Sequence, residues 1–172
     1  MTDRLFLRLG IKYGGRMDNQ SLEYIGNSEI VLIGIGEDFD NREDALDAYN
    51  KLFELVKDKR HFVISLCEDN VIYNSLFDEE NIVTPLDGNE EKWNKYNKWI
   101  TLTLNHSLCV LELGVGLKYP TVIRFPFEKI VFVNNKAVML RVNRKLYQST
   151  EELKEKCVGI KADPIDYINQ VE

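Results

Sequence analysis

The sequence predicts an α/β protein of the Rossmann-like, doubly wound kind, with a mostly parallel sheet of about six strands and helices on both faces. Short runs rich in Val, Ile and Leu recur without polar alternation, as in strands that are buried on both faces. Amphipathic helical segments separate several of these runs, and strands that alternate with helices form parallel sheets through right-handed crossovers. The 172 residues suffice for one domain with its own core, so we expect a single domain over 1–172.

The elements follow one another from residue 29 onward, after an N-terminal segment, 1–28, in which no element is predicted. Strands are predicted at 29–35, 61–66, 81–84, 107–113, 137–142 and 158–161. The helix predicted over 41–58 repeats apolar residues every three or four positions, with Asn41 as N-cap before an acidic first turn. A second helix is predicted over 89–104, and a third begins at Asp163-Pro164 with proline at its first position.

Composition excludes several classes of function. A net charge of −6 argues against a nucleic-acid binder, whose surface is basic, but not against a small anionic ligand held at a helix N-terminus. Cys67, Cys109 and Cys157 are odd in number and form no CxxC pair, which argues against structural zinc and a disulfide framework. No signal peptide follows Met1, and no run approaches the ~20 apolar residues of a membrane span. We therefore expect a cytoplasmic protein that needs no metal.

The first strand ends in a glycine turn, at the edge where open parallel sheets bind ligands. Gly34-Ile35-Gly36 permits a tight turn and brings backbone N–H groups close to a phosphate. No third glycine completes a GxGxxG spacing, and Glu37 and Asp38 would repel a pyrophosphate if their side chains pointed inward. A phosphate loop and an ordinary tight turn both stay open.

A second glycine turn, Gly114-Val115-Gly116, follows the strand predicted at 107–113 and precedes a proline turn and Arg124. Glycines at a strand end leave room for a ligand or for another backbone segment. Arginine suits phosphate or carboxylate recognition, and pairing of Arg124 with a surface acid is the alternative.

A longer motif around this second turn resembles a known family. It consists of Glu112-Leu113-Gly114-Val115-Gly116, Pro120, Ile123-Arg124 and Pro126-Phe127-Glu128. The pattern resembles the sirtuin family, most closely its bacterial, macrodomain-associated branch, and the resemblance extends along most of the chain from about residue 29. It implies a domain that binds NAD or another ADP-ribose-containing ligand. The residues it implies for this contact are Gly34, Ile35, Gly36, Gly114, Val115, Gly116, Arg124 and, at the adenosine ribose, Asn143.

The departures from the family concern catalysis. Sirtuins pass ADP-ribose from NAD to an acyl oxygen with a histidine as general base in an HG pair, and Asp87-Gly88 stands at that place here. Asp87 is either a base, although an exposed aspartate is a weak one at neutral pH, or part of an ordinary Asp-Gly turn. His61 and His106 both begin predicted strands, at the edge opposite the expected site, so we expect neither to be catalytic.

Other family features are also altered. Cys67 replaces an asparagine, as a reactive thiol or as a small buried side chain, and Asp69 keeps an aspartate that acts either in catalysis or as the cap of a helix near Asn70. The loop after the first glycines is short, with Arg42 as a closing arginine or a surface residue. The zinc-binding lobe is missing.

Three functions are compatible with this pattern. The first, which we favour, is a module that binds NAD or an ADP-ribose-containing nucleotide without lysine deacylase activity. The second is a minimal NAD-consuming enzyme, an NAD hydrolase or an ADP-ribosyltransferase, with Asp69 or Asp87 as its essential acid. The third is an interaction protein or homo-oligomer whose contact surface is the aromatic stripe of the helix at 89–104, unless that stripe belongs to the core.

Overall fold

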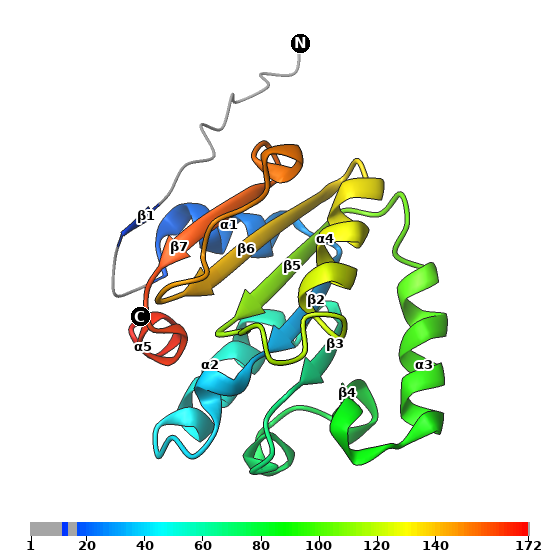
Figure 1. The fold of residues 1–172 in the computed structure, drawn as a ribbon, viewed down its shortest axis with the longest axis vertical. Coiled ribbons are helices and arrows are strands. Elements are labelled where there is room, and N and C mark those ends of the chain that lie inside the picture. The colour runs from blue at the N-terminus through cyan, green and yellow to red at the C-terminus, as the bar shows by residue number, and fades with distance from the viewer. Residues whose placement is uncertain (1–11, 14–16, 172) are drawn as a thin grey trace.

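The computed structural model describes residues 12–13 and 17–171, so the predicted absence of a signal peptide concerns residues outside this part. One parallel sheet runs through the molecule in the order β1-β7-β6-β5-β2-β3-β4 (Figure 1). Its strands are β1 (Lys12–Tyr13), β2 (Ile30–Ile35), β3 (Arg60–Ser65), β4 (Ile82–Val83), β5 (Leu108–Leu113), β6 (Ala137–Asn143) and β7 (Cys157–Lys161). The predicted α/β class with a parallel sheet is confirmed.

The direction of strand addition reverses between β2 and β5. The chain builds outward from β2 through β3 to β4, and then returns to the other side of β2 to add β5, β6 and β7. Ligands of doubly wound sheets bind outside the carboxyl ends of the strands at this switch point. The register pairs Ile35 with Leu113, so the two glycine turns leave the sheet side by side.

Helices cover both faces of the sheet (Figure 1). On one face lie α1 (Asn19–Asn27), α2 (Ala45–Val56) and α5 (Pro164–Asn169), and on the other lie α3 (Glu90–Thr101) and α4 (Arg124–Val133). Shorter 3₁₀ helices in the described loops are Glu37–Phe39, Val71–Asn74, Glu79–Asn81, Pro85–Asp87 and Glu151–Leu153. The helices predicted within 41–58, 89–104 and from Asp163 onward are present.

Two helices were not predicted. Helix α1 lies inside the 1–28 segment, where the Asp18 side chain accepts a hydrogen bond from Ser21 N–H and begins the helix. Helix α4 carries Pro126 in its first turn, and no helix was predicted there. Proline is tolerated at this place because the N–H groups of the first turn have no partner inside the helix.

Alternate residues of β2 face the two helical layers, which gives the protein one core on each side of the sheet. On the α3–α4 side, Gly34 takes the place of a side chain. A Cβ at Gly34 would lie 2.6 Å from Cε2 of Phe127 and 2.7 Å from Cγ2 of Ile123, so this glycine lets α4 approach the sheet closely.

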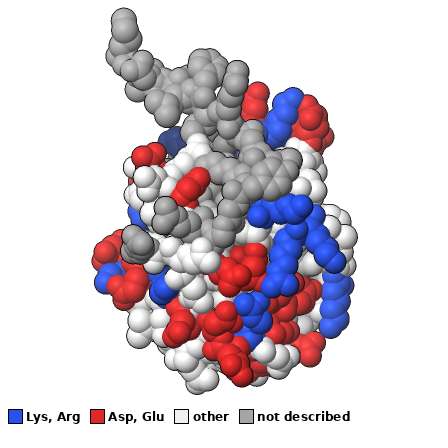
Figure 2. Space-filling model, turned by 90° about the vertical axis from the view of Figure 1, so that its left-hand side faces the viewer, with Lys and Arg blue, Asp and Glu red and all other residues white. Residues whose placement is uncertain are grey.

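The surface carries both signs of charge. Figure 2 shows one face on which acidic side chains lie beside basic ones. Ion pairs on the described surface include Lys57 with Glu54 and Lys95 with Glu80. None of the described helices is long and apolar enough to cross a membrane.

Candidate functional site at the carboxyl edge of the sheet

The two glycine turns pack directly against each other at the carboxyl edge. Gly36 N–H donates to the Leu113 carbonyl oxygen and Gly114 N–H donates to that of Val142, both at 2.8 Å. A Cβ at Gly36 would lie under 3.0 Å from the carbonyl oxygen of Gly114, so only glycine permits this contact. Gly114 itself has a φ of 64°, in the left-handed region that favours glycine.

Glu37 closes the gap between the turns. Its Oε2 accepts a hydrogen bond of 3.0 Å from Gly116 N–H, while its Oε1 is buried without a hydrogen-bond partner among the described residues. The side chain therefore points inward, toward the second turn. In this inward orientation, the sequence predicts, the Glu37 carboxylate would repel a pyrophosphate.

A cavity of about 450 Å³ opens beside the turns, at the carboxyl ends of β3 and β4. This volume lies within the range of small-molecule sites. Cys67 connects the cavity to the first turn, because its Sγ lies 3.4 Å from the Gly36 carbonyl oxygen. The residues that line the cavity are Cys67, Glu68, Asn70, Thr84, Leu86, Asp87 and Tyr119.

A chain of hydroxyl groups leads to Asp87 at this cavity. The Thr84 hydroxyl donates a short hydrogen bond to Oδ2 of Asp87, so the Tyr73 hydroxyl, 3.0 Å from Thr84 Oγ1, must act as the donor to it. Oδ1 of Asp87 accepts from Asn89 N–H at 2.9 Å. These bonds fix the orientation of the Asp87 carboxylate, although the residue is exposed.

Asp69, the other predicted acid, ties two loops together. Its Oδ2 accepts from Asn41 N–H at 2.8 Å and its Oδ1 from Val71 N–H at 3.1 Å, while Oδ1 of Asp40 accepts from the backbone N–H groups of Glu68 and Asp69. Asp69 thus bonds the first N–H of the short 3₁₀ helix Val71–Asn74, while the N-cap position itself is held by Asn70. Asp40, Cys67 and Asp69 place their ligand atoms within 4.8 Å of one another, but three of the four carboxylate oxygens already accept from backbone N–H groups, and we assign the cluster no metal.

Cys67 is a buried thiol. Its side chain lies near the hydroxyl of Tyr49, at 3.6 Å, and the Gly36 carbonyl. Burial raises the pKa of Cys67 to about 11, so the thiol stays protonated at neutral pH. The structure favours the small buried role over the reactive one.

Arg124 lies in a buried ion network rather than at the glycine turns. Its Nη1 is 3.1 Å from Oε1 of Glu112, and its Nη2 donates to the Leu146 carbonyl oxygen. Arg141, on the neighbouring strand, pairs with the same Glu112 carboxylate at 2.8 Å and with Glu128 at 2.8 Å. The predicted pairing with an acid is thus observed, but the acid is in the core: Glu112 is only 1% exposed.

The remaining predicted ligand contacts divide between edge and core. Asn143 is buried at the end of β6, where its amide donates to the Val115 carbonyl oxygen at 3.1 Å and holds the second turn. Ile35 and Val115 are buried in the two cores. Four of the predicted contact residues therefore lie at the edge: Gly36, Gly114, Gly116 and Asn143. The other four lie away from the edge, in the cores or in the ion network: Gly34, Ile35, Val115 and Arg124.

Arg42 is occupied by neighbouring acids. It pairs with Asp44 at 2.9 Å and with Asp163 at 3.0 Å, and Arg144 also pairs with Asp163. Burial acts to raise the pKa of Asp163, but the Asp166 N–H and the two guanidinium groups outweigh it and leave this pKa below its ordinary value. Arg42 thus anchors α5 to the loop after β2.

The two histidines lie where the sequence predicted, at the amino ends of strands. His61 is buried in β3 against the rings of Phe53 and Phe77, and His106 pairs with Glu29 at 3.2 Å. Neither belongs to the cavity.

The aromatic stripe of α3 packs onto the sheet. Tyr96 is buried, and the rings of Tyr96 and Trp99 each lie 5.4 Å from that of Phe62. Trp93 lies against Tyr96 at 5.2 Å. The aromatic stripe therefore packs in the core, which is the second of the two alternatives for it.

Sequence reasoning did not assign five of the cavity-lining residues to the site: Glu68, Asn70, Thr84, Leu86 and Tyr119. Thr84 is the last residue of the strand predicted at 81–84, so the rule that ligands bind at carboxyl ends could have found it. No sequence signal marked Tyr119, because the turn that carries it folds back over the edge only in three dimensions.

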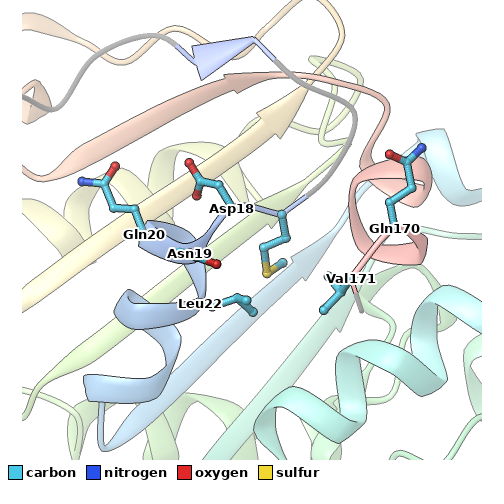
Figure 3. A pocket seen from close by; sticks show the side chains of 7 residues that line it. Asp18, Asn19, Gln20, Leu22, Gln170 and Val171 are labelled. Atoms are coloured by element: carbon cyan, nitrogen blue, oxygen red, sulfur yellow. The ribbon is translucent and has the colours of Figure 1, made fainter.

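Another cavity, of about 470 Å³, lies between the start of α1 and the end of α5 (Figure 3). Its lining is Met17, Asp18, Asn19, Gln20, Leu22, Gln170 and Val171. Met17 and Val171 adjoin residues outside the described part of the chain, so we assign this cavity no ligand.

Comparisons with known proteins give limited likenesses. No protein-family model matches the chain. Over 69 residues it is 23% identical to a protein ADP-ribosyltransferase of Staphylococcus aureus, a match that covers 40% of this chain and only 22% of that protein. A solved structure of an exopolyphosphatase-related protein from Bacteroides fragilis aligns over 85% of this chain and 38% of its own, with 16% identity and a TM-score of 0.47. Membership of the sirtuin family stays a prediction.

Proposed function

We propose that this domain binds NAD or another ADP-ribose-containing nucleotide across the carboxyl edge between β2 and β5. The observation that carries the proposal is the cavity of about 450 Å³ at the carboxyl ends of β3 and β4, next to the topological switch point between β2 and β5. The limited similarity to a protein ADP-ribosyltransferase supports the same ligand class. In this proposal one ribose lies in the cavity, the diphosphate crosses the turns, and the adenosine lies toward Asn143.

The described residues fit such a ligand in part. The cavity has polar groups from Thr84, Asp87 and Asn70, which suit ribose hydroxyls and a carboxamide. At the turns, by contrast, the Glu37 carboxylate occupies the Gly116 N–H, where a phosphate would be held. The ribose end thus fits the structure as it stands, and the diphosphate fits only after Glu37 moves.

Binding is tested by isothermal titration calorimetry with ADP-ribose and with NAD. Leu86 lines the cavity and is 42% exposed, so Leu86→Glu places a negative charge beside the ligand without a large change in the core. We expect the Kd for ADP-ribose to rise about tenfold or more, a change of ~1.4 kcal/mol, because the hydrated carboxylate would occupy space in the cavity that the ribose needs.

Leu76→Glu is the matched control, since Leu76 is 55% exposed and does not line the cavity. Its Kd should stay within about twofold of the wild type. Absence of heat and of a thermal shift with either nucleotide at millimolar concentration would refute the proposal.

A second candidate function is hydrolysis of NAD, and the oriented Asp87 is what favours it. The C–N bond between nicotinamide and ribose would break, a water oxygen would bond to the ribose carbon, and the proton lost from water would leave through the carboxylate. Asp87 lines the cavity and Asp69 does not, so Asp87 is the better placed of the two predicted acids. The similarity to a protein named an ADP-ribosyltransferase points to the same bond of NAD.

Asp87→Asn tests this function through nicotinamide release. General base catalysis is typically worth ~10²–10⁴ in rate, so we expect release to fall by about that factor while ADP-ribose still binds. Asp58→Asn, a change of equal charge at an exposed position, should leave the rate unchanged. If the wild type releases no more nicotinamide than buffer does, hydrolysis is excluded and the binding proposal stands alone.

A further inference from the structure

The contact between Glu37 and Gly116 joins two loops that are far apart in the sequence. Oε2 of Glu37 lies 3.0 Å from the nitrogen of Gly116, and Oε1 of the same carboxylate is buried without a partner among the described residues. A buried carboxylate oxygen that lacks a donor is unfavourable. The carboxylate is therefore held in place by one good hydrogen bond and not by a complete set.

The N–H groups of the glycine turns differ in how easily they can be released. Gly36 and Gly114 donate to the main-chain carbonyls of Leu113 and Val142, so freeing either group would require the strands to move apart. Gly116 donates to a side chain. A rotation of the Glu37 side chain alone would therefore free its N–H for an anion.

We propose that Glu37 is an internal competitor for the diphosphate: its carboxylate holds the anion position at Gly116, and it must swing out before the nucleotide binds. This inference rests on the proposed function. A carboxylate and a phosphate oxygen accept the same N–H and carry the same sign of charge, so they exclude each other. The apparent Kd is then the intrinsic one divided by the fraction of molecules in which Glu37 has moved.

The competition applies to the phosphate part of the ligand only. A ligand without a phosphate, such as adenosine, has no group that needs the Gly116 N–H. Removal of the carboxylate should therefore strengthen binding of ADP-ribose and leave binding of adenosine unchanged.

The test measures the Kd of the full chain for ADP-ribose and for adenosine by calorimetry. Glu37→Ala should bind ADP-ribose about tenfold or more tightly than the wild type, and adenosine within twofold of it. Glu37→Gln, which keeps the shape and the acceptor oxygen but not the charge, should lie between the two. Glu43→Gln removes a charge from an exposed residue in the same segment between β2 and α2, and it should change neither Kd.

Each alternative result has a distinct meaning. Equal ADP-ribose affinities in the wild type, Glu37→Ala and Glu37→Gln would overturn the competitor and leave the proposed function intact. An equal gain for adenosine would also overturn it, because loosened loops and not a vacated anion position would then explain the effect. If neither the wild type nor any variant binds ADP-ribose, the proposed function fails and the competitor fails with it.

Discussion

Gly36→Ala is expected to destabilise the protein by about 3 kcal/mol, because the added methyl group meets main-chain atoms that cannot turn aside. A Cβ at this position would lie under 3.0 Å from the Gly114 carbonyl oxygen and from Cα of Val115. Relief requires the two glycine turns to separate, which also breaks the Gly36 hydrogen bond to Leu113. Urea denaturation measures the loss.

Gly26→Ala is the matched control. Gly26 lies in α1, and a Cβ there would meet no atom within 4 Å. Alanine should raise the free energy of unfolding by about 0.5 kcal/mol, since it is the better helix former. If Gly36→Ala unfolds at the same urea concentration as the wild type, the close packing of the turns is incorrect.

Glu112→Ala is expected to cost about 3–5 kcal/mol of stability, as is usual when one partner of a buried ion pair is removed. Arg141 is 1% exposed and would lose its main counter-charge, and the half-buried Arg124 would lose its own. The loss should be measurable as a fall in the denaturation midpoint with an unchanged m-value.

Two further variants separate this network from ordinary surface pairing. Glu54→Ala breaks an exposed pair with Lys57 and should cost less than about 0.5 kcal/mol. Glu112→Leu combined with Arg141→Met removes both buried charges and should recover much of the stability lost in Glu112→Ala. A loss of less than about 1 kcal/mol in Glu112→Ala would mean that the charges are not buried as described.

Strands β2 to β7 and three of the five described α-helices could be predicted because their signals are local. A short, mostly apolar run without polar alternation marks a strand buried on both faces, and β2, β3, β5 and β6 all have one. Helix α4 was not predicted; its segment contains Pro126, which a helix accepts in its first turn.

The role of Arg124 could not be predicted from its own segment, because its partner is twelve residues away on another element. A signal was nevertheless present. Glu112 and Arg141 are single, opposite charges in two apolar strands, and they are direct neighbours in the register of β5 and β6. Opposite charges in adjacent buried strands predict a core ion pair, and Arg124 shares the Glu112 carboxylate of that pair.

The candidate site was predicted to the level of the sheet edge but not to its chemistry. The glycine turns located the edge, and the direction of the Glu37 side chain was left open. Its contact with Gly116 depends on the 3₁₀ turn of Glu37–Phe39 and on the path of a loop 79 residues later, and no sequence pattern specifies both.

The central claim is that an ADP-ribose-containing nucleotide binds across the carboxyl edge between β2 and β5. The most direct measurement is a titration of the ¹⁵N-labelled protein with ADP-ribose, followed by amide chemical shifts. The account predicts saturable shifts at Gly36, Gly116 and Asp87, with His106 and Lys136 at the opposite edge unchanged. Saturating ADP-ribose that leaves Gly36, Gly116 and Asp87 unchanged, or that shifts the opposite edge instead, would contradict it.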